Sequence, residues 1–220
     1  TGGVYIPKHF AMPPERVEQV LGRAGVGNLI TMHAEGPQAT MVPLYAETRA
    51  EGRRVLVTHL VRNNPQARQP MTGPGMVIID LAQAYVSPSW YATNAELPNV
   101  PTLDYLTVHV HGAVRVLPEA GLAMASELTR RSGEPEVLEQ VGDEKLRRMA
   151  RAIVGVEIEV ERIEAKAKMS QNRHPKDVES LLEHFERNGP REIADYLREV
   201  SLPYARARFE LIEGLRPQQD

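Results

Sequence analysis

The stretch that decides the fold is residues 155–173, GVEIEVERIEAKAKMSQNR. In its first half, the apolar residues Val156, Ile158 and Val160 alternate with glutamates. Successive side chains of a strand point to opposite faces of its sheet, so this period of two predicts a half-buried β-strand over 154–163. The second half ends in a cluster of hydrogen-bond donors directly after that strand.

Working outward from this strand, five more short runs have strand character and are separated by turn residues. They cover residues 28–33, 38–46, 53–60, 76–86 and 106–117. In the last of these runs Gly112 predicts a β-bulge. Strands do not alternate regularly with helices, and neither GxGxxG nor GxxxxGK[ST] occurs, which argues against Rossmann and P-loop folds. The pattern favours a small antiparallel barrel with helical additions.

The helical additions are predicted from apolar residues at helical spacing and from prolines at helix starts. Helices are expected over 14–23, 118–131 and 143–152. The tail is helical, with a stripe of Val178, Leu181, Leu182 and Phe185, and a last helix that starts at Pro203. We therefore expect a barrel domain over 1–165 and a helical extension over 166–220 packed on the barrel.

The composition limits the function classes. The chain of 220 residues has no cysteine, which excludes disulfides, zinc–thiolate sites, iron–sulfur clusters and cysteine nucleophiles. Its 26 basic and 29 acidic residues are well mixed, so no basic stripe predicts a nucleic-acid partner. No apolar run approaches the roughly 18 residues that span a bilayer, and no signal peptide precedes Tyr5. We expect no membrane partner and a cytoplasmic location.

The first candidate site lies where a predicted strand ends, at His59, Arg62, Asn63 and Asn64. An arginine with amide donors suits a phosphate or carboxylate group. The neutral imidazole of His59 could ligate iron. The alternative is a polar turn whose asparagines cap a helix.

The second candidate is AYVSPSWY, residues 84–91, which holds the one tryptophan of the chain. Aromatic faces beside hydroxyl groups suit a flat conjugated ligand. The relevant side chains are Tyr85, Ser87, Ser89, Trp90 and Tyr91. The alternative is a barrel end that is closed by aromatic side chains.

Two further segments carry polar side chains. His109 and His111 share one strand face, but no third ligand is placed by spacing, so a half-exposed strand face is favoured over a metal site. Lys168, Gln171 and Arg173 place donors just before a helix that starts near Pro175, which suits an anion. A solvated basic turn is the alternative.

Taken together, these segments resemble the PaiB family, whose members are described as FMN-binding negative transcriptional regulators. The matching stretches are YIPKHF at 5–10, HLVRNNPQ at 59–66, AYVSPSWY at 84–91, VPT at 100–102, VHVHG at 108–112 and GVEIEVERIEAKAKMSQNR at 155–173. The resemblance implies a split β-barrel of the pyridoxamine-phosphate-oxidase type. It also implies a homodimer that holds its cofactor between subunits.

The chain departs from the family where polar or aromatic groups would surround a flavin. Ala67 follows NPQ in place of tryptophan, and Leu103-Asp104 replaces Trp-Asn. Residues 81–84 read LAQA where the family has GPHA, and 39–44 read ATMVPL without the histidine of ATHLPF. A haem needs an apolar slot, one axial ligand and cations for its propionates. These departures favour haem b over FMN, with His59 as the iron ligand.

One branch of PaiB-like proteins, the haem-dependent piperazate synthases, is similar in this respect. This resemblance implies cyclisation of the amino acid N5-hydroxy-L-ornithine with loss of water. It suggests Tyr85, Tyr91 and His109 as proton carriers, and Lys168 with Arg173 as carboxylate or propionate partners. The cofactor-binding set would be His59, Arg62, Asn63, Asn64, Ser87, Ser89, Trp90, Gln171 and Arg173. An FMN-binding oxidoreductase and a transcriptional regulator are the alternatives, and the regulator ranks last because no basic recognition helix is visible.

Overall fold

The computed structural model describes residues 3–23 and 25–215. The chain divides into two compact units, which are described separately. Unit 1 comprises residues 1–12, 80–107 and 165–220, and unit 2 comprises residues 13–79 and 108–164. The predicted division into a barrel over 1–165 and a helical extension over 166–220 stays a prediction.

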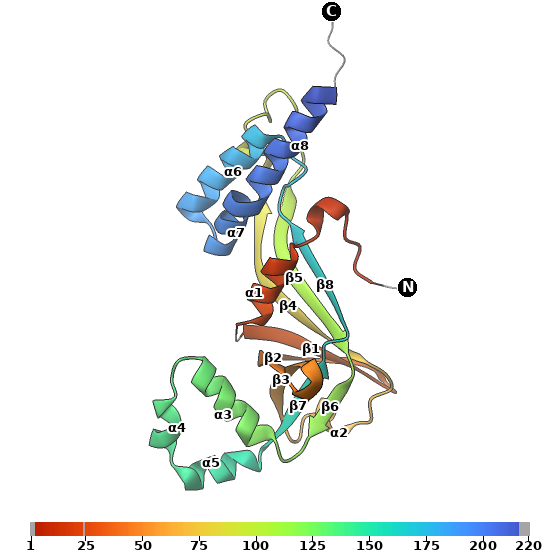
Figure 1. Cartoon of the computed structure of the whole chain (residues 1–220), viewed down its shortest axis with the longest axis vertical. Helices are drawn as coiled ribbons and strands as arrows, with labels where there is room; N and C mark the ends of the chain where they lie inside the picture. The colour runs from red at the N-terminus through yellow and green to blue at the C-terminus, as the bar shows by residue number, and fades with distance from the viewer. Residues whose placement is uncertain (1–2, 24, 216–220) are drawn as a thin grey trace, which may run out of the picture. The chain divides into compact units, whose positions relative to one another are not determined.

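The strands form a curled antiparallel sheet in the order β6-β7-β3-β2-β1-β4-β5-β8 (Figure 1). Their bounds are β1 Gly25–His33, β2 Gly36–Thr48, β3 Arg54–Val61, β4 Gly75–Val86, β5 Thr102–Gly112, β6 Val114–Leu117, β7 Ile153–Glu159 and β8 Arg162–Lys168. Strands β4, β5 and β8 each have residues in both units. Together with the helices, this sheet confirms the predicted split-barrel class.

Two of the six predicted strands are each divided into two. The run 106–117 becomes β5 and β6 on either side of Ala113, and the run 154–163 becomes β7 and the start of β8. The cause lies at Gly112, where an added Cβ would stand 1.7 Å from the backbone oxygen of Glu159. Only glycine permits so close an approach of two backbones. The predicted bulge is thus a break between strands.

Unit 2 is built on long antiparallel pairs. The β1–β2 hairpin runs from Gly25↔Leu44 to His33↔Gly36, and Gly36 turns the chain with a φ of 115°. Strand β3 pairs with β2 and β7, and its Val55 and Val57 form a core with Tyr45 and Met124. This core covers the face of β3 on which Val55 and Val57 lie.

The helices of unit 2 lie before and between its strands in the sequence. They are α1 Pro14–Leu21, α2 Pro65–Arg68, α3 Gly121–Arg131, α4 Glu136–Val141 and α5 Asp143–Ala150, with a short 3-10 turn at Ala50–Gly52. Helices α3, α4 and α5 lie together, and α3 contacts β3 and β7 (Figure 1). Helix α3 supplies Met124 to the core, as its apolar spacing requires.

Unit 1 holds the helices of the tail, which lie side by side in Figure 1. They are α6 Pro175–Asn188, α7 Arg191–Tyr196, a π-helical turn Leu197–Ser201 and α8 Leu202–Leu215, and two 3-10 turns cover Lys8–Phe10 and Pro88–Trp90. The predicted stripe of α6 is confirmed, because Val178, Leu181 and Phe185 are buried. The last helix begins one residue before Pro203. No described helix is long and apolar enough to cross a membrane.

Candidate functional site

His59 lies near the end of β3, in unit 2. In the β3–β7 ladder it stands opposite Gly155, where an added Cβ would meet Sδ of Met124 at 2.5 Å. Helix α3 therefore lies close to this part of the sheet. The Nδ1 atom of His59 is buried and has no hydrogen-bond partner among the described residues. Burial lowers the pKa of this imidazole, since it disfavours the charged form, so His59 is neutral at pH 7.

The polar residues after His59 stabilise the loop itself. The guanidinium of Arg62 donates to the backbone carbonyl oxygens of Arg151, Pro118 and Ile153 at 2.9 to 3.1 Å. Asn64 caps α2 by accepting from the backbone N–H of Gln66, and Asn63 is exposed. The alternative interpretation, a turn whose asparagine caps a helix, is thus confirmed for Asn64. The Arg62 side chain therefore connects the loop after β3 to the backbone near Pro118 and residues 151–153.

The aromatic segment of unit 1 forms a compact cluster around Trp90. The indole stacks on His184 with ring centroids 3.8 Å apart, and Tyr85 meets it edge-on at 6.3 Å. Tyr85 is 57% exposed. The hydroxyls of Ser87 and Ser89 bond to each other at 2.8 Å. One face of the tryptophan is therefore occupied by a histidine that sequence reasoning did not select.

Tyr91 and Arg173 come together in unit 1, as the prediction of a shared site requires. The Arg173 guanidinium lies 4.6 Å from the centre of the Tyr91 ring and donates to Oδ1 of Asn99 at 2.8 Å. The Tyr91 hydroxyl is buried without a well-aligned partner among the described residues. Burial raises the pKa of Tyr91, so the phenol keeps its proton at neutral pH.

Asp104 is the residue of unit 1 that the sequence analysis missed as a functional group. It is 1% exposed, and its Oδ2 accepts from Ser170 at 2.7 Å. Nζ of Lys168 lies 4.0 Å from its Oδ1. Burial raises the pKa of Asp104 to about 6, against the opposing effects of Ser170, Lys168 and Arg173. The signal in the sequence was an acid between apolar neighbours, in place of the family's asparagine.

Lys168 and Gln171, the remaining donors of this turn, are engaged within unit 1. Nζ of Lys168 donates to Oγ1 of Thr102 at 2.6 Å and to the carbonyl oxygen of Leu103 at 2.7 Å. Gln171 is buried and bonds to the backbone of Met169 and Ala167. Gln171 therefore shapes the turn that follows β8. Lys168 is partly exposed and is the better placed of the two to meet a ligand.

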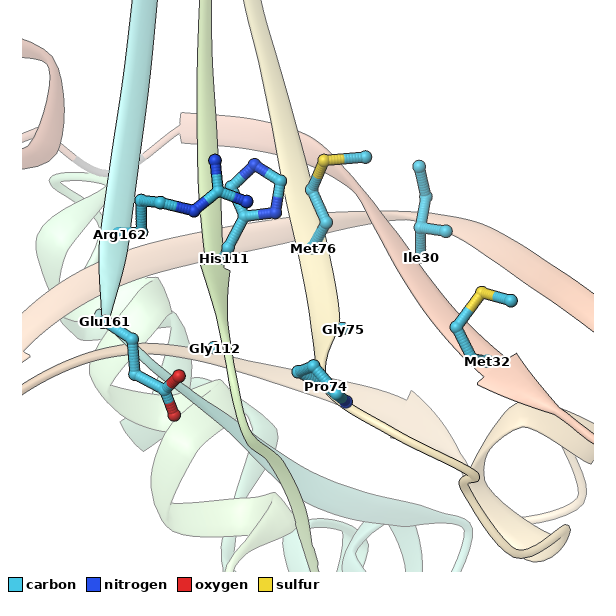
Figure 2. Close-up of a pocket in the computed structure, with 9 residues that line it drawn as sticks. All are labelled: Ile30, Met32, Pro74, Gly75, Met76, His111, Gly112, Glu161 and Arg162. Atoms are coloured by element: carbon cyan, nitrogen blue, oxygen red, sulfur yellow. The ribbon is translucent and has the colours of Figure 1, made fainter. Parts of the chain in front are cut away.

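A pocket of about 300 Å³ lies in unit 2, and of the side chains considered in the sequence analysis His111 is the one that lines it. We call it the β4–β5 pocket. Its lining residues are Ile30, Met32, Pro74, Gly75, Met76, His111, Gly112, Glu161 and Arg162 (Figure 2). His109, which was selected, is half-buried on the same strand as His111. The pocket was missed because its walls come from four strands that are distant in the sequence.

Of the groups that a haem needs from the protein, the described residues supply a suitable iron ligand but no evident partner for the propionates. A neutral, partly buried imidazole with an unpartnered nitrogen is what an axial iron ligand requires, and His59 meets that condition. No group of three or more histidine, aspartate or glutamate side chains that could hold a metal occurs within the described residues. The guanidinium of Arg62 is already bound to carbonyl oxygens, so it is a poor partner for a propionate or a phosphate.

With the fold and these side chains in place, comparison with known proteins identifies the family. Residues 4–162 match the model of the family described as "Putative FMN-binding domain". The chain belongs to this family. It is also 28% identical over 190 residues to the "Protease synthase and sporulation protein PAI 2" of Bacillus subtilis (strain 168), which covers 83% of this chain and 89% of the relative. The resemblance to PaiB is thus supported at the level of the family.

Two solved structures share the fold at low identity. The FAD and haem binding protein from Mycobacterium smegmatis has a TM-score of 0.53 at 16% identity, over 73% of this chain and 74% of that one. The flavocytochrome Anf3 from Azotobacter vinelandii has a TM-score of 0.52 at 14% identity, over 74% of this chain and 72% of that one. These likenesses support the split-barrel architecture.

Proposed function

We propose that this member of the FMN-binding family binds haem b through His59 and forms an N–N bond. In the proposed reaction, N5-hydroxy-L-ornithine cyclises to L-piperazate with loss of water. The observation that carries the proposal is the neutral imidazole of His59, whose buried Nδ1 has no partner among the described residues. A haem-binding relative in fold, from Mycobacterium smegmatis, gives further support.

The reaction balances without an external oxidant or reductant. The N–O bond of the hydroxylamine breaks, the α-amine nitrogen bonds to N5 after losing a proton, and the oxygen leaves as water. The iron of bound haem would supply Lewis acidity to the hydroxylamine. The phenol of Tyr91 holds its proton at neutral pH, which suits a proton donor. The roles of Tyr85 and His109 in proton transfer, and of Lys168 toward the substrate carboxylate, stay proposals that are tested singly.

The test of the cofactor is an absorption spectrum of the purified chain titrated with hemin. We expect a Soret band that His59→Ala removes or shifts, whereas His9→Ala leaves it unchanged. An identical haem spectrum in His59→Ala would contradict the axial role. Incubation of the haem-loaded chain with N5-hydroxy-L-ornithine, followed by mass spectrometry, should then show loss of one water.

The second candidate is an FMN-binding oxidoreductase, which the family description favours. It predicts that the chain is isolated with a yellow chromophore and does not take up hemin. A regulator that binds DNA is the third alternative, and sequence-specific binding that persists at raised salt would support it.

We also propose that the chain is a homodimer in the cytoplasm. Unit 2 exposes large apolar side chains on its first two strands, including Val26 and Met41. Clustered apolar exposure of this kind is typical of surfaces that meet another protein. A mass in solution of one chain, measured by light scattering, would contradict the dimer.

A further inference from the structure

The β4–β5 pocket has a floor that is fixed by two glycines. An added Cβ at Gly75 would lie 2.8 Å from the carbonyl oxygen of Ile30, and one at Gly112 would lie 1.7 Å from that of Glu159. Neighbouring backbones therefore hold both positions in place. A pocket with a floor of tightly packed backbone is formed before a ligand arrives, which lowers the entropic cost of binding.

One wall of the pocket is apolar. Met76 of β4 stands directly opposite Ile30 of β1 in the strand register, and Met32 follows two residues later on the same face. Figure 2 shows these three side chains on the side of the pocket away from Arg162. Met32 is 41% exposed. Flexible, polarizable thioethers pack well against flat rings, so this wall suits an aromatic or similarly compact apolar group.

The opposite wall is polar and carries hydrogen-bond donors. Arg162 of β8 and His111 of β5 lie next to each other (Figure 2). Both contact Oε1 of Glu164. The His111 Nε2 lies 2.7 Å from that oxygen, although the ring is not aligned for a hydrogen bond. Glu164 neutralises one positive charge and fixes both side chains at the edge of the pocket.

Arg162 has hydrogen-bond donors that are available to a ligand. Its Nη1 donates to Glu164, and the described part of the chain supplies no partner for its Nε or Nη2. The side chain is 49% exposed, so a ligand can reach it. Glu161 also lines the pocket, but one of its oxygens accepts from the backbone N–H of Ala113, and its side chain points away from Arg162 in Figure 2. Within the described residues, the groups left without a partner on this wall include the Nε and Nη2 donors of Arg162 and the second carboxylate oxygen of Glu161.

From this arrangement we propose that the β4–β5 pocket binds a small carboxylate with a flat apolar body. The apolar body would lie between Met76, Met32 and Ile30, and the carboxylate would accept two hydrogen bonds from the fork of Arg162. The pocket volume of about 300 Å³ suits a molecule of one ring with a short acidic substituent. The site shares no residue with those expected to hold haem or FMN, so it stands whether or not the proposed function is correct.

The test uses the full chain and three probes that differ in charge at one position, namely benzoate, benzamide and benzylammonium. NMR signals of the Met32 and Met76 methyl groups and of the His111 ring report binding. We expect benzoate to shift these signals with saturation and the other two probes to bind at least about tenfold more weakly, since only the carboxylate pairs with Arg162.

The variants separate a specific site from general surface binding. Arg162→Gln should weaken benzoate binding about tenfold, and Met32→Gln should weaken it by a smaller factor. Arg148→Gln on the exposed face of α5 should leave binding unchanged. Thermal melts show whether each variant is folded. The proposal is overturned if benzoate causes no saturable shift, if benzylammonium binds as tightly, or if folded Arg162→Gln and Arg148→Gln bind alike.

Discussion

The turn after β8 in unit 1 and the β4–β5 pocket in unit 2 each place a cation beside a carboxylate, but they use it differently. In unit 1, Lys168 lies 4.0 Å from the buried Asp104 and donates to Thr102 and Leu103. In unit 2, Arg162 contacts Glu164 and keeps other donors free. A basic residue at the end of a strand is therefore a candidate ligand partner only where the protein leaves its donors unbound.

The largest effect is expected at the floor of the pocket. Gly112→Ala would place a Cβ 1.7 Å from the backbone oxygen of Glu159, so the strands must separate. We expect a loss of about 3 kcal/mol or more in the free energy of unfolding, together with loss of benzoate binding. Urea unfolding measures the first. Gly73→Ala is the control, because nothing lies within 4 Å of its added Cβ; equal stabilities of the two variants would contradict the close approach.

The second prediction concerns the buried acid of unit 1. The folded-state pKa of Asp104, about 6, lies above the ordinary value of 3.8, so the folded state binds this proton more tightly than the unfolded state does. The resulting stabilisation is complete below the unfolded value and is lost as the pH rises through about 6. A shift of roughly two units corresponds to about 3 kcal/mol.

Asp104→Asn removes this titration while keeping the shape of the side chain. We expect the variant to be more stable than the parent by roughly 1 to 3 kcal/mol at a pH of about 8, with little difference at a pH of about 4. Urea unfolding at both pH values measures this. A variant that is less stable than the parent at the higher pH would mean that Lys168, Arg173 and Ser170 outweigh the cost of burying the charge.

The smallest expected effects are the changes in stability when each of two arginines of unit 2 is replaced. Arg62→Gln removes donors to the carbonyl oxygens of Arg151, Pro118 and Ile153, and we expect it to cost about 1 to 2 kcal/mol of stability. Arg162→Gln breaks a pair whose arginine side chain is 49% exposed, and it should change stability by less than about 0.5 kcal/mol. Melting temperatures in parallel measure both. A larger loss of stability in Arg162→Gln than in Arg62→Gln would show that Arg162 is the structural residue and that Arg62 is the free one.

Most of the fold could be predicted from local pattern. The stripe on α6 reports directly which face is buried. The alternation of Val156 and Ile158 predicted a strand correctly but wrongly predicted that it is half-buried, because Glu157 between them is buried as well. The two breaks that turn six runs into eight strands could not be predicted, because they depend on Glu159 passing close to Gly112. Local patterns do not encode how closely two distant segments approach each other.

The candidate site was less predictable, because residue type does not reveal which groups satisfy one another. Arg62 and Gln171 have the chemistry of ligand donors, but the backbone carbonyl oxygens that they bind are visible only in three dimensions. Asp104 and Arg162 were missed for the opposite reason. Burial of the first and the free donors of the second arise from the strands on either side, and the local sequence reveals neither property.

The stacking of Trp90 on His184 gives the chain an internal optical reporter. This tryptophan is the single one in the sequence, and its ring contacts lie within unit 1. Indole emission therefore follows events in unit 1, and unit 2 contributes no tryptophan signal of its own. Comparing emission with far-ultraviolet circular dichroism during denaturation would reveal whether the two units melt together or in sequence.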